Sequence, residues 1–370
     1  MSEAVSETAN DLQSRFVALH EFIPAAEAAC QPEHWAYLIG GTETETTVAR
    51  NRAALDAVAL RPRVLVDVST IDSTADVLGT PSRLPICLAP VGGLESFHKD
   101  GALAVAKGAG TFGVPMMMSS VGPRSMEEIR AATKSAVIFQ LYVRGGARFI
   151  EDHVERAITA GFDAFALTVD VAVYSRRERD LVLRFDKPWR RYVNPDSERA
   201  QAALSWKDVA RIRKAYPSLK LIIKGIMTVE DARIAADHGV DVVYVSNHGG
   251  RQLDHGLGSV DALPDIVEAL GSEARAIVDG GICRGTDIVK AIALGAHAVG
   301  IGRLYCYGLA AAGPEGIVRL LEILEDEVRS ALGLTGVSSF ADLGLEHVKR
   351  GAPLMTQASV HSAFPLLRED

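Results

Sequence analysis

The feature that most constrains the fold is an alternation of two kinds of segment between about residues 84 and 303. One kind is a short apolar run rich in β-branched residues, as expected of a strand buried on both faces of a parallel sheet. The other kind is rich in Ala, Glu and Arg, spaces its apolar residues as a helix does, and often ends in Gly. The predicted strands are 85–91, 114–120, 136–142, 164–170, 220–226, 241–247, 274–280 and 298–303.

The number and length of these units favour one α/β architecture. Predicted helices over 101–113, 125–133, 149–161, 229–239 and 285–296 lie between the strands. Eight strand–helix units in about 220 residues match a TIM (β/α)8 barrel. The main alternative is a doubly wound open sheet, which usually has five or six strands and a G-x-G-x-x-G turn after the first. Here the first strand runs into Pro90-Val91-Gly92-Gly93, which does not fit that pattern.

The flanking regions and one long connection complete the predicted organisation. An N-terminal helical arm, residues 1–83, precedes a barrel over 84–333, and a tail follows over 334–370. About 50 residues, 171–219, separate the fourth and fifth strands. Their first part, about 171–204, has many charges and no clean period. Long inserts in compact domains are usually functional lids or disordered loops, and we interpret this one as a lid.

Composition excludes several classes of function. The 370 residues are 48% hydrophobic, and 39 Lys and Arg stand against 47 Asp and Glu, a formal net charge of −8. An acidic chain has no global electrostatic footprint for nucleic acid or an anionic membrane, and no apolar run approaches the ~20 residues of a membrane span. The polar, acidic start of the chain does not resemble a secretory signal. Four scattered cysteines without a C-x-x-C pair predict reduced thiols, no metal site and a cytoplasmic location.

Polar side chains and glycines stand at nearly every predicted strand end. In a (β/α)8 barrel the carboxyl ends of the strands form the working face. Polar groups buried there cost desolvation free energy unless a ligand uses them, so this pattern indicates an enzyme. The residues at these ends are Val91, Gly92, Ser119, Gln140, Tyr142, Thr168, Asp170, Lys224, Ser246, Asn247, His248, Asp279, Gly280, Gly281, Gly302 and Arg303.

The most informative string is SNHGGRQLD, residues 246–254. His248 can accept a proton near neutral pH, and Arg251 offers a planar fork that suits a carboxylate. The pair predicts a substrate with an ionised acid beside a C–H or O–H to be deprotonated. Asp170 could hold His248 and raise its basicity. Arg177, at the root of the lid, is either another carboxylate partner or part of a solvated charge run.

The spacing of the residues does not decide the role of two further features. Residues 279–282 and 300–303 place backbone N–H groups and Arg303 after the last two strands, where barrels often hold a phosphate. Lys224 could form a Schiff base, as in aldolases, or supply a fixed positive charge.

Taken together, these strings resemble the FMN-dependent L-2-hydroxy acid oxidases and dehydrogenases, a group that includes glycolate, lactate and mandelate enzymes. The resemblance extends from about residue 34 to 340 and includes AYLIGGTETETTVARNRAAL in the arm. The other matching strings are FQLYV (139–143), LTVD (167–170), IIKGI (222–226), SNHGGRQLD, DGG-x-x-RGTD (279–287) and GIGR.

The resemblance implies a role for each matching position. His248 is the active-site base paired with Asp170, and Tyr142 contacts the substrate near its hydroxyl. Tyr37, Arg177 and Arg251 hold the substrate carboxylate. Lys224 lies by the flavin N1/O2 edge, which removes the Schiff-base alternative. The other implied FMN contacts are Pro90, Val91, Gly92, Ser119, Gln140, Thr168 and Ser246 for the ring and ribityl group, and Asp279, Gly280, Gly281, Ile282, Cys283, Gly302 and Arg303 for the phosphate.

Three positions depart from the family pattern. Cys283 stands where an Arg usually helps to hold the phosphate, so either Arg284 substitutes for it or Arg303 carries more of that role. Val121 replaces a bulky Trp of glycolate-type members, which leaves room for a longer or aromatic substrate. Gly92 stands where typical oxidases carry Ala and several dehydrogenases and monooxygenases carry Gly, which changes the space for oxygen or peroxide beside the flavin and leaves the electron acceptor open.

The sequence therefore predicts FMN-dependent oxidation of an L-2-hydroxy acid larger than glycolate to the 2-keto acid, with O2 as acceptor and H2O2 as product. A quinone-linked dehydrogenase or a lactate-monooxygenase-like enzyme would share the first half-reaction. Another FMN or phosphate-binding barrel, either an isomerase or an aldolase, and a non-catalytic binding barrel are further alternatives. By analogy with the family, a homotetramer or larger assembly is expected.

Overall fold

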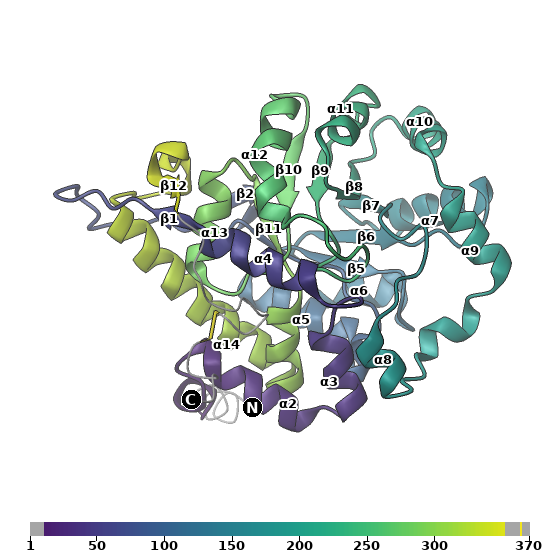
Figure 1. The fold of residues 1–370 in the computed structure, drawn as a ribbon, viewed down its shortest axis with the longest axis horizontal. Helices are drawn as coiled ribbons and strands as arrows, with labels where there is room; N and C mark the ends of the chain where they lie inside the picture. The colour runs from purple at the N-terminus through teal and green to yellow at the C-terminus, as the bar shows by residue number, and fades with distance from the viewer. Residues whose placement is uncertain (1–10, 352–362, 365–370) are drawn as a thin grey trace.

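A computed structural model describes residues 11–351, 363 and 364. Eight parallel strands close into a barrel in the order β4 to β11, and β11 pairs with β4 to complete the ring (Figure 1). The predicted TIM barrel is thus confirmed, with all eight strands where the sequence indicated them. The strands are β4 (Ile86–Leu88), β5 (Met116–Ser119), β6 (Val137–Leu141), β7 (Ala164–Thr168), β8 (Leu221–Ile226), β9 (Val242–Val245), β10 (Arg275–Val278) and β11 (Ala298–Ile301).

Helices cover the outside of this barrel. Both faces of each strand are therefore buried, which explains why the strands read as continuous apolar runs rather than alternating ones. Inside the barrel, side chains such as Met117, Ile222 and Tyr244 form a separate core cluster. The helices that follow the strands are α5 (Ala102–Phe112), α6 (Met126–Ala132), α7 (Ala147–Thr159), α10 (Trp206–Ala215), α11 (Val229–Asp237), α12 (Ser259–Leu270), α13 (Gly285–Ala293) and α14 (Arg303–Thr335).

The last helix, α14, is divided into two parts by a kink. Helix α14 starts at Arg303, directly after the eighth strand, and is kinked where Ala312 and Gly313 leave helical geometry. Gly313 has a φ of +63°, and Pro314 behind it lacks an N–H donor, so the chain bends there and resumes as a helix. Its first part therefore brings Arg303 to the barrel rim.

The N-terminal arm packs around the barrel and supplies part of its rim. It contains η1 (Leu19–Glu21), α2 (Phe22–Ala29), α3 (Pro32–Ile39) and α4 (Thr46–Asp56). Strand β1 (Val58–Leu60) then pairs with β12 (Val348–Arg350), which follows the short helices η4 (Phe340–Asp342) and η5 (Leu345–His347). The hairpin of β2 (Ala75–Val77) and β3 (Thr80–Ser82) precedes the barrel, where η2 (Leu94–Ser96) follows its first strand.

The region predicted as a lid is more ordered than its sequence suggests. It contains α8 (Glu178–Val182), η3 (Pro188–Tyr192) and α9 (Pro195–Ala202), which lie together on the side of the molecule away from β1 and β12 (Figure 1). These helices are too short for a periodic apolar face, so pattern reading misses them. They are fixed instead by local devices: Asn194 caps α9, and a buried ion pair of 2.7 Å joins Lys187 to Asp180.

Within the described ranges, no helix combines the length and apolarity that crossing a membrane requires.

Candidate active site

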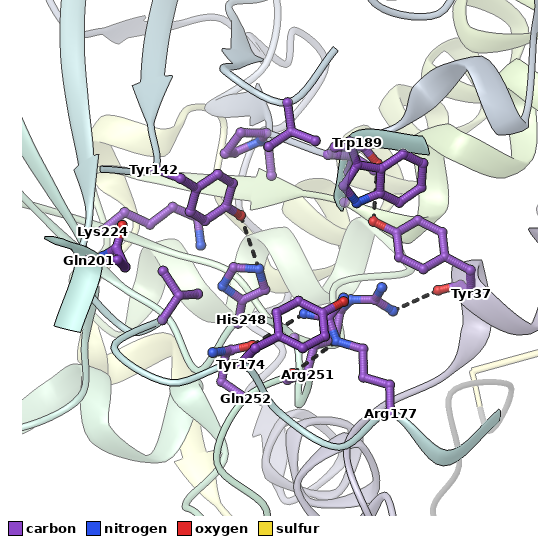
Figure 2. A pocket seen from close by; sticks show the side chains of 18 of the residues that line it. Tyr37, Tyr142, Tyr174, Arg177, Trp189, Gln201, Lys224, His248, Arg251 and Gln252 are labelled. Carbon is purple, nitrogen blue, oxygen red and sulfur yellow. Dashed lines mark hydrogen bonds between the residues drawn. The ribbon is translucent and has the colours of Figure 1, made fainter. Parts of the chain in front are cut away.

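A cavity of about 740 Å³ opens at the carboxyl ends of the barrel strands. Its wall combines the arm, the barrel rim and the lid, and Figure 2 shows side chains from all three converging on it. The volume lies within the usual range for a small-molecule or cofactor site. Most of the predicted site residues form its surface: Tyr37, Pro90, Val91, Gly92, Tyr142, Arg177, Lys224, His248, Arg251, Asp279, Gly280, Gly281, Ile282, Cys283, Gly302 and Arg303.

The remaining predicted residues lie directly behind that surface. Asp170 contacts His248, and Ser246 accepts a hydrogen bond from Lys224. Gln140 and Thr168 form a buried pair, in which Gln140 Nε2 donates to Thr168 Oγ1 over 2.8 Å. The Ser119 hydroxyl accepts from the backbone N–H of Val121.

His248 stands between an acid and a phenol. Its Nδ1 lies 3.0 Å from Asp170 Oδ1, and its Nε2 lies 3.3 Å from the Tyr142 hydroxyl (Figure 2). The carboxylate fixes the tautomer with the proton on Nδ1, so Nε2 is left to accept a proton. Burial lowers the pKa of His248 below its ordinary value, although Asp170 opposes the shift. The imidazole is therefore neutral at pH 7, as a base must be.

Local backbone geometry makes this pairing possible. His248 has a φ of +59°, an uncommon conformation for a residue with a side chain. Gly225, in the fifth barrel strand, has a φ of +115°, and a Cβ there would lie 2.6 Å from the Asp170 Cβ. Only glycine lets the strand pass this close to Asp170, which explains the Gly that follows Lys224.

Arg177 and Arg251 bring two guanidinium groups to the same wall. Among the described residues, neither has a carboxylate partner. Arg251 uses only its Nη1, which donates to the carbonyls of Tyr37 and Gly40, while Arg177 Nη2 donates to Gln252 Oε1. Burial, with Arg177 close by, lowers the pKa of Arg251 to about 10. Uncompensated cations held this close are unfavourable unless an anion joins them, so this wall is suited to a carboxylate.

Lys224 lies opposite, surrounded by buried polar groups. Its Nζ donates to Ser246 Oγ over 2.8 Å and lies 3.2 Å from Asp279 Oδ2. Two buried oxygens nearby, Gln140 Oε1 and Asp279 Oδ1, have no hydrogen-bond partner within the described ranges. Buried polar atoms are rarely left unpaired in proteins, so these atoms indicate a polar ligand at this place.

At the end of the first barrel strand, Gly92 lies against Tyr37 and Val121. The carbonyl of Gly92 accepts a hydrogen bond of 3.1 Å from the Tyr37 hydroxyl. A Cβ at Gly92 would lie 3.0 Å from Val121 Cγ1, so the Val121 side chain occupies the space beside that glycine. The two family departures at Gly92 and Val121 are therefore in contact and have to be considered together.

In the turn after the seventh strand, the backbone passes very close to the backbone of α4. Gly280 and Gly281 have φ values of +102° and +80°, and a Cβ on Gly281 would lie 3.0 Å from the Asn51 carbonyl of α4. The Arg52 guanidinium donates to the Gly281 carbonyl over 2.8 Å and pairs with Asp287 at 2.7 Å. This buried network holds the turn in place.

The prediction that Arg284 could replace the arginine missing at position 283 is wrong. Arg284 does not turn toward the cavity to replace the missing arginine at Cys283. Its guanidinium pairs with Glu327 at 2.5 Å, because that carboxylate also binds the backbone N–H of Gly285. The backbone N–H groups of Cys283 and Arg284 are bound by Asp287 Oδ2. Of the basic side chains considered for this end, only Arg303 reaches the cavity surface, at the start of α14.

Pattern reading missed residues that act through the tertiary structure. Asn51 and Arg52 lie on α4, far from the barrel in sequence. Gln201 on α9 joins the lid to two strand ends, accepting from Val143 N over 2.6 Å and donating to the Thr168 carbonyl. Arg144, which lines the cavity after the third barrel strand, was also missed. A lone Gln or Arg among charged residues carries no sequence signal, so only the fold identifies them.

Comparison with known proteins decides the family. Residues 26–350 match the FMN-dependent dehydrogenase family. The chain belongs to this family. It is 37% identical over 352 residues to the L-lactate oxidase of Nostoc sp., covering 88% of this chain and 96% of the relative. It is 39% identical over 343 residues to the 4-hydroxymandelate oxidase of Amycolatopsis orientalis, covering 88% and 96%.

Solved structures agree with the family assignment. A crystal structure of mandelate oxidase with (S)-2-phenylpropionate superimposes with a TM-score of 0.83 at 38% identity, covering 91% of this chain and 99% of the other. Mandelate oxidase with benzoyl-formic acid gives a TM-score of 0.83 at 38% identity. The resemblance that the sequence motifs suggested is therefore confirmed.

The residues present fit FMN, the cofactor of the FMN-dependent dehydrogenase family. The unpartnered Gln140 and Asp279 oxygens can accept hydrogen bonds from N–H or O–H groups of the cofactor, and the Lys224 ammonium can donate to it. Gly302 has open space where a Cβ would stand, and it precedes the N-terminus of α14. A helix N-terminus beside an arginine suits a phosphate.

Proposed function

We propose that this protein oxidises L-2-hydroxy acids to 2-keto acids, with FMN as cofactor and O2 as the final acceptor, reduced to H2O2. The observation that carries the proposal is the meeting of a carboxylate-held imidazole and two unpaired guanidinium groups in one cavity. A hydroxy acid has the two features this arrangement recognises, an ionised acid and an adjacent hydroxyl. Relatives named as lactate, glycolate and 4-hydroxymandelate oxidases support the reaction class.

Each side chain has a defined task in this proposal. Arg177 and Arg251 bind the substrate carboxylate, with Tyr37 beside them, and so fix the α-carbon. Tyr142 binds the substrate oxygen, and Nε2 of His248 takes a proton while Asp170 stabilises the imidazolium that forms. FMN, when bound, supplies the acceptor for two electrons.

The cofactor is held by the opposite part of the cavity. Lys224 places a positive charge beside the ring edge that becomes electron-rich. Gly302, Arg303 and the turn over residues 279–283 hold the phosphate. The ring and ribityl group lie against residues from the strand ends, namely Pro90, Val91, Gly92, Ser119, Gln140, Thr168 and Ser246.

The space near Val121 favours a substrate larger than glycolate, with an aliphatic or aromatic side chain. The cavity wall there is formed by apolar and aromatic side chains, among them Phe97, Val121, Trp189 and Val193. Structural neighbours named as mandelate oxidase support a large substrate.

An anaerobic flavin-reduction experiment tests the proposed function. The purified protein, loaded with FMN, should lose its yellow absorbance when an L-2-hydroxy acid is added without oxygen. No bleaching with any aliphatic or aromatic hydroxy acid would contradict the proposal. In air, equal amounts of H2O2 and keto acid indicate an oxidase, and a decarboxylated product indicates a monooxygenase. Turnover that requires an added quinone and gives keto acid without H2O2 indicates a dehydrogenase.

An aldolase-like Schiff base on Lys224 is less well supported, because its Nζ is bound by Ser246 and lies beside Asp279 rather than standing free as a nucleophile. Borohydride trapping of a carbonyl compound on Lys224 would restore that alternative.

The proposal also covers the domain organisation, the cellular location and the oligomeric state. We assign residues 84–333 to the catalytic barrel, 171–204 to its lid, 1–83 to the arm and 334–370 to the tail, of which 1–10, 352–362 and 365–370 lie outside the described residues. The free thiols of Cys30, Cys87, Cys283 and Cys306 support a cytoplasmic location. The exposed apolar residues Val64, Leu65 and Val66 support a homo-oligomer, a tetramer or larger, which light scattering in solution would test.

A further inference from the structure

Arg144 is a basic side chain in the cavity wall that the proposed chemistry does not use. It follows the third barrel strand, β6, two residues after Tyr142, and it lines the cavity from the rim. The side chain is half-buried, and no hydrogen bond or ion pair of its guanidinium is found within the described ranges. Burial, reinforced by the positive charge of Arg190, lowers its pKa although Tyr142 opposes the shift.

The other basic groups of the wall are all accounted for. Lys224 pairs with Asp279, Arg190 pairs with Glu198 at 3.0 Å, and Arg199 pairs with Asp196 at 3.4 Å. Arg177 and Arg251 are assigned to the substrate carboxylate, and Arg303 to the cofactor phosphate. Arg144 therefore remains as a partly desolvated cation with no anion in the proposed complex.

Its surroundings suit the far end of a substrate rather than the cofactor. Arg190 of the lid also lines the cavity, close enough for its charge to lower the pKa of Arg144. The Arg190 guanidinium is stacked 3.8 Å from the centre of the Tyr174 ring, which fixes its position. Glu198 neutralises part of the Arg190 charge, so Arg144 carries the uncompensated charge. Two guanidinium groups, one from the rim and one from the lid, attract an anion into the space between barrel and lid.

We propose that Arg144 binds a second carboxylate at the distal end of the substrate, so that the preferred substrates are 2-hydroxy dicarboxylic acids. This inference rests on the proposed function, because it names the substrate class of the same site. The planar fork of Arg144 matches a carboxylate, and a neutral side chain in the same place leaves the guanidinium unpaired. Arg144 thus sets specificity and takes no part in proton transfer.

Matched pairs of substrates test this assignment. The holoenzyme is mixed anaerobically with the 2-hydroxy diacids of four, five and six carbons, and with the 2-hydroxy monoacids of the same lengths. For at least one length, flavin reduction should be about tenfold more efficient with the diacid, a ratio typical of one charge-assisted hydrogen-bonded contact. In Arg144→Leu this ratio should fall to near one, with the monoacid rate changed by less than about twofold.

Two variants provide the controls. Arg199 also lines the cavity but is 77% exposed and paired, so Arg199→Leu should keep the diacid preference. Arg144→Gln repeats the charge removal in case the leucine variant folds poorly. Binding of the 2-oxo diacid product, followed by the change in flavin absorbance, should weaken in both Arg144 variants and provides a readout independent of turnover.

The outcomes separate the two proposals. If monoacids are preferred at all three lengths, or if the ratio is unchanged in both Arg144 variants, the distal-carboxylate assignment is overturned while the proposed function stands. If no hydroxy acid of either kind reduces the flavin, the proposed function itself fails.

Discussion

The two anion-binding ends of the cavity are built in opposite ways. At the substrate end, Arg177 and Arg251 come from a lid helix and a barrel loop, and Arg251 keeps its Nε and Nη2 clear of hydrogen bonds to the described residues. Arg303, at the start of α14, donates to the carbonyls of Leu38, Gly40 and Gly249, and the Gly40 carbonyl also accepts from Arg251. Substrate recognition thus relies on free side-chain donors, whereas the phosphate site combines backbone shape with an arginine whose position is already fixed.

This difference explains how the family departure at Cys283 is tolerated. The thiol is buried, and burial raises its pKa to about 12, so it adds no charge to the phosphate end. What remains is a glycine turn held by Arg52 and Asp287, together with the N-terminus of α14. A phosphate site formed mainly by a rigid backbone loses less binding affinity when one side chain is replaced than a site formed by side chains does.

The largest expected effect is at the substrate end, in His248. Replacement with Asn keeps the size and part of the hydrogen bonding but removes the base. Flavin reduction by the hydroxy acid should slow by roughly 10²- to 10⁴-fold, the usual contribution of general-base catalysis. FMN binding, measured by quenching of its fluorescence, should be unchanged. Full activity of His248→Asn would show that the imidazole is not the base.

The next effect is in Arg251, where shape matters as well as charge. Arg251→Lys retains a cation but loses the planar fork. The kcat/KM should fall about ten- to a hundredfold, as expected for loss of one or two hydrogen bonds to a charged group. Steady-state kinetics on one hydroxy acid measure this loss, and a wild-type value in the variant would mean that Arg251 only supports the arm through Tyr37 and Gly40.

A matched pair of variants at the phosphate end sharpens the contrast. Arg303→Lys should weaken FMN binding by about tenfold, because a charge-assisted hydrogen bond is lost there. Arg284→Lys is the control, since Arg284 faces Glu327 rather than the cavity. Fluorescence titration of the apoprotein with FMN gives both affinities. Equal weakening in the two variants would contradict the view that Arg303 alone of this pair serves the phosphate.

The smallest expected effect is in the pH dependence of kcat/KM. The pKa of His248 is lowered by burial, and Asp170 opposes that shift. Since the neutral imidazole is the active form, kcat/KM should be lost as the pH falls, with a midpoint below the ordinary histidine value of about 6.5. In Asp170→Asn the opposing charge is gone, so the midpoint should move to lower pH while the plateau rate falls. A midpoint that moves upward in that variant would overturn the assigned direction.

Much of the site was predictable because sequence-local rules position it. The strands end where the apolar runs end, so the residues that follow them had to meet at one rim. His248, Arg251, Asp170 and Lys224 were therefore expected to be neighbours before any coordinates. The lid was not predictable in the same way, since α8 and α9 depend on caps and on the Lys187–Asp180 pair rather than on a periodic apolar face.

The barrel, the order of its strands and the family could be predicted from the sequence, because periodicity and strand-end chemistry are local properties of the chain. Which side chains have partners depends on the tertiary structure. Arg284 pairs with Glu327 and leaves the cavity, whereas Arg144 has no such partner within the described ranges and faces it. Pairing of this kind joins residues that are distant in sequence. It depends on how the helices pack around the barrel, and a local sequence pattern does not contain that information.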